Sequence, residues 1–357
     1  MIYNNNFKNK TLSIYKKHKK KITTALRIII SLGLIAYLIF FRSEIKNFRT
    51  FLDILKAVNI PLLIASASLH IFGVWISAFR WQILLKTQGI KISVGYLSSS
   101  FLIGSFFNNL LPTSIGGDIF RTIDIAKKAN VSVGKSASIL IIERFSGILT
   151  AAFYAVIALF LGFTTVNKTS YTIPVILFFI ICIIIGFIIL NPSLLRLNKI
   201  IDKIKFLARI RSKIKEVYDI FQNFKQFKLA IFEVMICGFA LQIGVIANYY
   251  LASKAFGIEL SFASFIFIVP IVYTIAMLPI SIGGIGIREN SLVFLMVALG
   301  ADGEKSTVAS LILFVMILAV GIVGAIVYIL RPFILKQQTP KISPSDIQKD
   351  AEVKDKV

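Results

Sequence analysis

Cysteine and histidine are almost absent from this chain. Among 357 residues there are two cysteines, Cys182 and Cys237, and two histidines, His18 and His70. Both cysteines lie inside apolar runs, so they provide no disulfide framework of the kind that stabilises small secreted domains. The histidines lie far apart and have no cysteine or glutamate at a metal-ligand spacing. We therefore expect no disulfide scaffold, no metal site and no cofactor.

Charged residues are also scarce. They make up 16% of the chain, whereas hydrophobic residues make up 57% and the mean hydropathy is +0.82. Soluble domains carry about a quarter of their residues as charged side chains. The composition therefore predicts an integral membrane protein.

Acidic residues are the scarcest charged type, with 17 Asp and Glu against 40 Lys and Arg and a net charge of +23. The basic residues gather in the first 27 positions and in residues 191–228, next to hydrophobic spans. No aromatic and basic motif typical of nucleic-acid binding accompanies them. We expect membrane lipids with anionic headgroups as partners, and not nucleic acid.

Long apolar stretches are abundant. A bilayer core of about 30 Å requires about 20 apolar residues in a helix. Six stretches meet this requirement: residues 25–41, 60–79, 136–163, 172–190, 229–251 and 307–330. The first follows a basic segment but lacks a small-residue cleavage pattern, so we expect an uncleaved helix rather than a signal peptide.

Two further apolar stretches are interrupted. Residues 96–111 run into Pro112 and residues 262–278 run into Pro279, and each proline is followed by a Gly-Gly pair. Backbone that is broken at membrane depth must be buried in protein or line a wet cavity. The fold class predicted is an all-α polytopic membrane protein with about six full transmembrane helices and two re-entrant broken-helix hairpins arranged as an inverted repeat.

The distribution of lysine and arginine predicts the topology. Short cytoplasmic loops are enriched in these residues, which places the N-terminus, residues 196–228 and the C-terminal tail in the cytoplasm of a cell with the chain in its plasma membrane. Residues 162–171 and 252–261, with one lysine each, fall outside. The loop 42–59 disagrees with this count because it carries four basic residues on the predicted outer side.

The same pattern divides the chain into segments. We expect a basic cytoplasmic N-terminus at 1–24, a transmembrane domain at 25–332 with halves 25–190 and 229–332, and a disordered cytoplasmic tail at 333–357. The connector 191–228 has apolar residues near helical spacing and a basic opposite face. It is either an amphipathic helix at the surface of an anionic leaflet or an ordinary cytoplasmic connector.

The two interrupted stretches are copies of one motif. Residues 111–121 (LPTSIGGDIFR) and 278–288 (LPISIGGIGIR) match at seven of eleven positions without a gap. The shared pattern, L-P-x-S-I-G-G-x-x-x-R, occurs once in each half. Its presence at the end of a hydrophobic run in both halves predicts paired broken helices, which alternating-access transporters place at their midplane binding sites.

Each copy reads as a helix that ends, a tight turn and a new helix. Proline bends the chain, and the glycines, Gly116 and Gly117 or Gly283 and Gly284, permit positive φ and close backbone approach. Serine (Ser114 or Ser281) can cap nearby amides, and the following helix N-terminus attracts an anion. Arg121 and Arg288, about one turn into that helix, are suited to a phosphate.

Other interpretations stay open for these residues. Small residues also permit close packing of crossing helices, and an arginine can be an interfacial anchor whose charge reaches the headgroups. An internal ion pair with Glu289 is a third possibility for Arg288.

Further polar residues lie in or beside apolar segments. Glu143 and Arg144 interrupt the third span, and intramembrane charges are either functional or paired. Asp118 and Arg121, at i and i+3, can face one another, while Arg144 can answer Asp118 or Glu143 can answer Arg121.

Amides and one arginine complete the set. Asn108 and Asn109 can bind a headgroup or make hydrogen bonds between helices. Arg80 and Trp81 end the second span and have the features of an interfacial anchor.

At these residues the chain resembles the lysylphosphatidylglycerol synthase transmembrane, or flippase-like, family. The likeness rests on residues 106–112 (FFNNLLP), Gly116 to Arg121, Glu143-Arg144, and Pro279 through Gly286 to Arg288-Glu289, and it spans residues 24–332. In that family, multiple peptide resistance factors join such a membrane region to a soluble aminoacyltransferase, and the membrane region moves aminoacylated phosphatidylglycerol between leaflets. The residues after Pro332 are too few to fold as that transferase, so the resemblance implies the translocation half.

The leading hypothesis is translocation of an anionic or aminoacylated phospholipid, or of a polyprenyl or glycolipid phosphate. The expected headgroup contacts are Asn108, Asn109, Ser114, Gly116, Gly117, Asp118, Arg121, Glu143, Arg144, Ser281, Gly283, Gly284, Arg288 and Glu289. One alternative is a membrane-embedded transferase that acts on phosphatidylglycerol or another lipid phosphate, with Glu143 or Asp118 as base. Another is a non-catalytic partner of a separate lipid synthase. A homo-oligomer is also possible.

Overall fold

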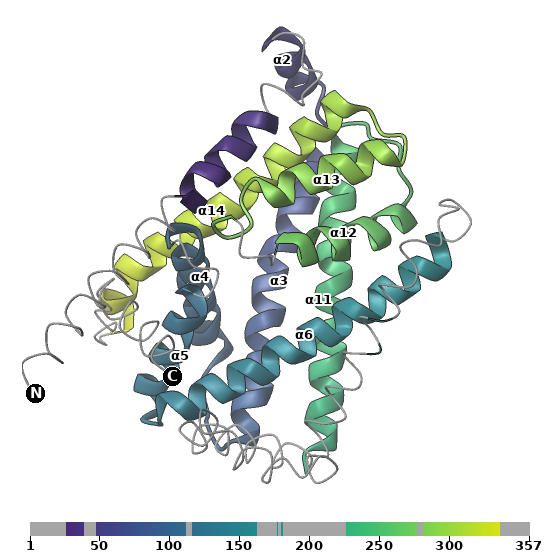
Figure 1. Ribbon diagram of the computed structural model, residues 1–357. Helices are drawn as coiled ribbons and strands as arrows, with labels where there is room; N and C mark the ends of the chain where they lie inside the picture. Colours follow the sequence, from purple (N-terminus) through teal and green to yellow (C-terminus); the bar gives the residue numbers. More distant parts are fainter. Residues whose placement is uncertain are drawn as a thin grey trace, which may run out of the picture.

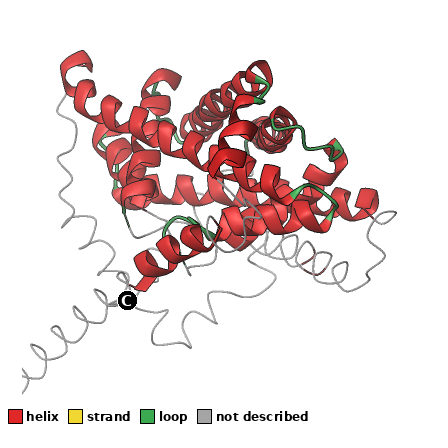
Figure 2. Cartoon of the chain, turned by 90° about the horizontal axis from the view of Figure 1, so that it is seen from above, coloured by secondary structure: helices red, strands yellow, loops and turns green. Residues whose placement is uncertain are grey.

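The computed structural model describes residues 26–38, 48–111, 116–162, 226–276 and 281–335, together with Leu177 and Ile180. Helices make up most of these residues, and no strand occurs among them (Figure 2). The prediction of an all-α polytopic membrane protein is therefore confirmed. The predicted N-terminus, nearly all of span 172–190, of the connector and of the tail, and Ser114 lie outside the described residues.

The described elements follow one another as a series of helices (Figure 1). They are a helix at Leu26–Tyr37, α2 (Phe48–Lys56), α3 (Ile60–Thr87), α4 (Val94–Leu110), α5 (Gly116–Ala129), α6 (Val133–Gly162), α11 (Lys228–Ala255), α12 (Phe262–Ala276), α13 (Ile287–Ala298) and α14 (Gly303–Leu335). Within the described ranges, α3, α6, α11 and α14 are long and apolar enough to cross a membrane. They correspond to four of the six predicted spans.

Local sequence explains where α3 and α4 begin. Asn59 accepts a hydrogen bond from the Leu62 amide at 3.2 Å, and Pro61 occupies the first turn of α3, where its missing N–H costs nothing. Ser93 caps α4 in the same way by accepting from the Tyr96 amide. With about 1.5 Å per residue, the 28 residues of α3 extend about 42 Å, which exceeds the bilayer core.

Large apolar side chains remain exposed along the long helices. Examples are Ile71 on α3, Phe232 on α11 and Phe333 on α14, which are 72%, 62% and 80% exposed. A soluble monomer rarely presents so much contiguous apolar surface, whereas a lipid-facing helix must. These faces are the surface that the bilayer covers.

The two halves pack against each other with α3 and α11 antiparallel. The Asn59 amide donates to the Ala255 carbonyl at 2.9 Å, Ser66 donates to the Asn248 carbonyl at 2.9 Å, and Gly73 lies against Leu241. Between successive pairs, the residue number rises by seven on α3 and falls by seven on α11, so the two helices run antiparallel in a constant register. The figure shows the two helices side by side through the centre of the molecule (Figure 1).

The contacts between the other helices follow the same pattern in both halves, with each helix of one half replaced by its counterpart in the other. Helix α4 packs on α5 and on α14 of the other half, and α12 packs on α13 and on α6 of the other half. Helix α5 also contacts α6, as α13 contacts α14. Exchange of partners around an antiparallel central pair is the packing that an inverted repeat produces.

Candidate functional site

Three buried charged residues meet beside the first break. The Glu143 carboxylate on α6 accepts from Arg80 Nη2 on α3 at 3.2 Å and from Arg121 Nη2 on α5 at 2.6 Å. All three residues are at most 5% exposed. One carboxylate therefore joins α3, α5 and α6 through two arginines.

A second carboxylate extends this cluster toward the surface. Asp118 at the start of α5 accepts from Arg144 Nη2 at 2.7 Å and Nε at 3.0 Å, and it lies 3.6 Å from Arg121 Nη1. The Arg144 side chain is half exposed. We call Arg80, Asp118, Arg121, Glu143 and Arg144 the break cluster; its three arginines outnumber its two carboxylates, so it carries one net positive charge.

Arg121 of the break cluster is held by aromatic rings as well as by carboxylates. The Arg121 guanidinium carbon lies 4.2 Å from the ring centre of Trp81 and 3.9 Å from that of Phe101. Among the described residues, no hydrogen-bond partner reaches Nε of Arg121 or Nε and Nη1 of Arg80. Because the two rings fix the Arg121 guanidinium in place, its Nε stays available without further ordering.

The glycines of the first break permit close packing. A Cβ on Gly117 would collide with the Gly104 carbonyl of α4 and lie 2.8 Å from the Asn108 side chain. The Gly117 amide donates to Asn108 Oδ1 at 2.8 Å, so this amide already has a partner. A Cβ on Gly116 would lie 2.6 Å from Leu111 Cδ1. Of the two roles that the sequence suggested for these glycines, positive φ and close backbone approach, close backbone approach applies at the first break.

The glycines of the second break permit positive φ. Gly283, Gly284 and Gly286 have φ of 57°, 78° and 83°, which side chains disfavour. The turn is fixed by the Gly286 amide, which donates to Glu289 Oε2 at 2.6 Å. Arg288 Nη2 lies 2.7 Å from Glu289 Oε1, so the ion pair considered for Arg288 is formed.

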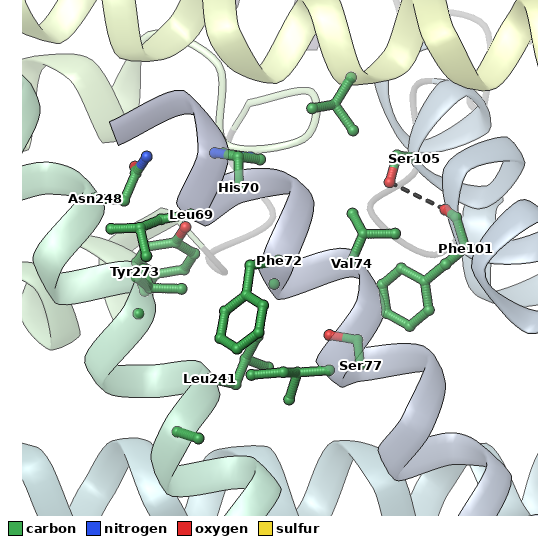
Figure 3. Close-up of a pocket in the computed structure, with 16 residues that line it drawn as sticks. Leu69, His70, Phe72, Val74, Ser77, Phe101, Ser105, Leu241, Asn248 and Tyr273 are labelled. Atoms are coloured by element: carbon green, nitrogen blue, oxygen red, sulfur yellow. Dashed lines mark hydrogen bonds between the residues drawn. The ribbon is translucent and has the colours of Figure 1, made fainter. Parts of the chain in front are cut away.

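The two breaks approach each other, and a small cavity lies between helices of the two halves. A Cβ on Gly283 would lie 3.4 Å from the Asn108 carbonyl oxygen. A cavity of about 180 Å³ lies between α3, α4, α11 and α12. Figure 3 shows Phe101 and Ser105 on one side and Asn248 and Tyr273 on the other. Phe101, one of the residues that line this cavity, also contacts the Arg121 guanidinium, so the break cluster lies behind this part of the cavity wall.

The predicted site residues thus fall into two groups. One is Asp118, Arg121, Glu143 and Arg144 with Gly116, Gly117 and Asn108 at the first break. The other is Gly283, Gly284, Arg288 and Glu289 at the second, where the Ser281 hydroxyl is buried without a partner among the described residues. Asn109 instead donates to the Ile317 carbonyl of α14 at 3.2 Å, so it joins two helices.

The interfacial-anchor interpretation of Arg80 and Trp81 is wrong. Helix α3 continues to Thr87, and Arg80 and Trp81 are 5% and 1% exposed. Their contacts are with Glu143 and Arg121 in the break cluster. The signal was present in the sequence as an arginine followed by further apolar residues, Ile83 to Leu85, which extend the helix. No three His, Cys, Asp or Glu side chains gather for a metal within the described ranges.

Residues 25–332 match the family described as the lysylphosphatidylglycerol synthase TM region. The chain belongs to this family. It is 24% identical over 297 residues to UPF0104 membrane protein PH1989 of Pyrococcus horikoshii, covering 78% of this chain and 88% of that protein. It is 27% identical over 183 residues to UPF0104 membrane protein MJ1595 of Methanocaldococcus jannaschii, covering 49% and 53% of the two chains. A membrane protein with a lipid-related role is the function that this membership supports.

Proposed function

We propose that this protein moves a lipid with an anionic phosphate headgroup between the leaflets of the plasma membrane. The headgroup passes between the two breaks, contacts the break cluster and the Arg288 side, and leaves the acyl chains in the bilayer. Both chain termini are on the cytoplasmic side in this proposal. The observation that carries it is the excess of arginine in the break cluster, which is buried at Arg80, Arg121 and Glu143 and half exposed at Arg144.

A net positive charge inside a membrane is costly unless an anion balances it. Asp118 and Glu143 balance two of the three guanidinium groups, which leaves one positive charge that a single phosphate can balance. Arg144 is half exposed and can turn from Asp118 to an arriving headgroup, while Arg121 is held between two rings. A guanidinium fork matches two oxygens of a phosphate.

The arrangement of the helices supports translocation rather than static binding. The exchanged packing of α4 and α12 is that of an inverted repeat, and such repeats alternate access by moving one half against the other around a central site. A cavity lies between helices of the two halves, and Phe101 in its wall contacts Arg121 of the break cluster. Its volume, about 180 Å³, suits a phosphate with a small substituent.

The test is lipid transport by the purified chain in vesicles. Fluorescent phosphatidylglycerol and phosphatidylcholine are compared by chemical quenching of the outer leaflet. Arg144→Gln should slow phosphatidylglycerol transport about tenfold, because a hydrogen bond to a charged group contributes about 1.5–3 kcal/mol. Lys127→Gln, an exposed change at the other end of α5, is the matched control and should leave the rate unchanged.

Wild-type rates in folded Arg144→Gln and Arg288→Gln proteins would refute this site. Formation of a modified lipid from phosphatidylglycerol and an added donor would favour the transferase alternative. Absence of transport, with restoration of activity to a co-purifying synthase, would favour the partner alternative. Vesicles without protein provide the baseline for all three measurements.

A further inference from the structure

A second polar cluster lies at the other end of α5, away from both breaks. Asp124 accepts hydrogen bonds from Tyr96 at 3.0 Å, from Ser100, and from Arg331 Nη2 of α14 at 2.9 Å. Asp124 and Arg331 are 1% and 5% exposed. None of these four residues or Lys128 belongs to the repeated motif or to the break cluster.

Both carboxylate oxygens in this cluster have partners, whereas one nitrogen of the arginine has none among the described residues. Both oxygens of Asp124 are occupied by three donors, whereas Nη1 of Arg331 has no hydrogen-bond partner within the described residues. The Arg331 guanidinium carbon stacks 3.8 Å from the Tyr96 ring centre, and the Lys128 ammonium lies 5.2 Å from the same ring. Two cations therefore share one aromatic ring beside one carboxylate.

A cavity of about 470 Å³ opens at this place, between the start of α4, α5 and the end of α14. Its polar side carries Lys91, Lys128 and Arg331, so with Asp124 behind them these four described residues sum to two positive charges. A Cβ on Gly95, also in the lining, would meet nothing within 4 Å, so the first turn of α4 is open to the cavity.

The other side of the same cavity is apolar. Val327, Leu330 and Ile334 line it on consecutive turns of α14, and Leu330 and Ile334 are 46% and 74% exposed. A free inorganic anion gains nothing from this wall. A molecule with an anionic head and a hydrocarbon chain fits both sides.

We infer that this cavity binds one anionic phospholipid, separately from the translocation site. Its phosphate lies against Lys91, Lys128 and Arg331 at the first turn of α4, and an acyl chain follows Leu330 and Ile334 along α14. The bound lipid joins the start of α4 to the end of α14. This inference does not rest on the proposed transport function.

The experiment measures lipid binding to the purified full chain in a non-ionic detergent by native mass spectrometry and by the shift in thermal unfolding temperature. Lys91→Gln with Lys128→Gln should weaken phosphatidylglycerol binding about tenfold, because each basic residue near a lipid surface contributes about fivefold before screening. Lys86→Gln with Lys127→Gln removes two exposed lysines that do not line the cavity, and should change binding less than about twofold.

Phosphatidylcholine and inorganic phosphate are the two ligand controls. Both should give smaller shifts than phosphatidylglycerol in the wild type. Equal weakening by the two double variants, or inorganic phosphate as effective as the lipid, would overturn the inference. Repeating the binding titration in Arg144→Gln distinguishes this cavity from the translocation site. In that background the Lys91→Gln and Lys128→Gln changes should still weaken phosphatidylglycerol binding, even if transport is absent from every variant.

Discussion

The two breaks of this protein carry the same eleven-residue motif but neutralise its arginine differently. Arg121 pairs with Glu143 on α6, which also pairs with Arg80 on α3. Arg121 lies close to Asp118 of its own helix as well. Arg288 finds its carboxylate in the next residue, Glu289. The first arrangement makes three helices depend on one ion-pair network, whereas the second is complete within a single turn.

Extending the gap-free register of the repeat shows where this difference arises. Glu143 aligns with Ser310, Asn108 with Ile275 and Asn109 with Ala276. Ser310 donates to the Glu289 carbonyl at 3.2 Å, so the second half uses a neutral hydrogen bond where the first uses a charge. At the first break, buried ion pairs hold the helices together. At the second break, a neutral hydrogen bond and glycines with positive φ take that place. Substitutions that exchange these features should separate the two roles.

The largest effect should come from Glu143→Ser, which gives the first half the residue of the second. Arg80 and Arg121 would remain buried without their shared carboxylate. Removal of one partner from a buried pair costs about 3–5 kcal/mol. We expect a large fall in the thermal unfolding temperature in detergent, measured by size-exclusion chromatography after heating.

Glu233→Gln is the matched control for this change, because Glu233 is an exposed carboxylate on α11. It should alter the unfolding temperature little. An unfolding temperature for Glu143→Ser equal to that of the control would contradict the idea that Glu143 holds α3, α5 and α6 together.

Intermediate effects should distinguish the glycines of the two breaks. Gly117 is limited by space, so Gly117→Ala and Gly117→Asn should both destabilise the protein, by about 1–3 kcal/mol. Gly283 is limited by its φ of 57° and has only an ordinary contact beside it. Gly283→Asn should therefore cost less than Gly283→Ala, because asparagine visits the left-handed region more readily.

The control for these glycine variants is Gly33→Ala, since nothing lies within 4 Å of a Cβ there and the residue is helical. It should be neutral or stabilising by up to about 1 kcal/mol. The same thermal unfolding measurement serves all five proteins. If asparagine and alanine are equally harmful at position 283, backbone conformation is not what that glycine provides.

Four of the six predicted spans, and the ends of α4 and α12 before the two breaks, were predicted correctly because they follow from local composition. Apolar runs long enough for a bilayer became α3, α6, α11 and α14, and the i, i+3 spacing of Asp118 and Arg121 brought those two together. The possible pairings of Glu143 with Arg121 and Arg144 with Asp118 both formed. These pairs required only that neighbouring helices pack side by side.

Features that depend on distant segments were not predictable in the same way. Arg80 was misread because its partner lies 63 residues away, and hydropathy alone makes an arginine resemble the end of a span. Identical Gly-Gly pairs gave close packing alone in one half, but positive φ together with close packing of Gly284 against Ala276 in the other, because their backbone angles depend on what packs against them. The cavity at Lys91, Lys128 and Arg331 lies between α4, α5 and α14, so the sequence of no single segment predicts it.

The smallest effect should come from Asn109→Ala, which again gives the first half the residue of the second. Asn109 Nδ2 donates to the Ile317 carbonyl of α14, and Gly321 gives its side chain room. Hydrogen bonds between helices within membranes contribute about 0.6 kcal/mol on average, because the same groups also find partners in the unfolded state within the membrane. The unfolding temperature should fall by only a few degrees, and lipid transport should persist. A loss of transport with the fold intact would mean that Asn109 contacts the headgroup, and would place the polar path of the first half along α4 instead of along α5 and α6.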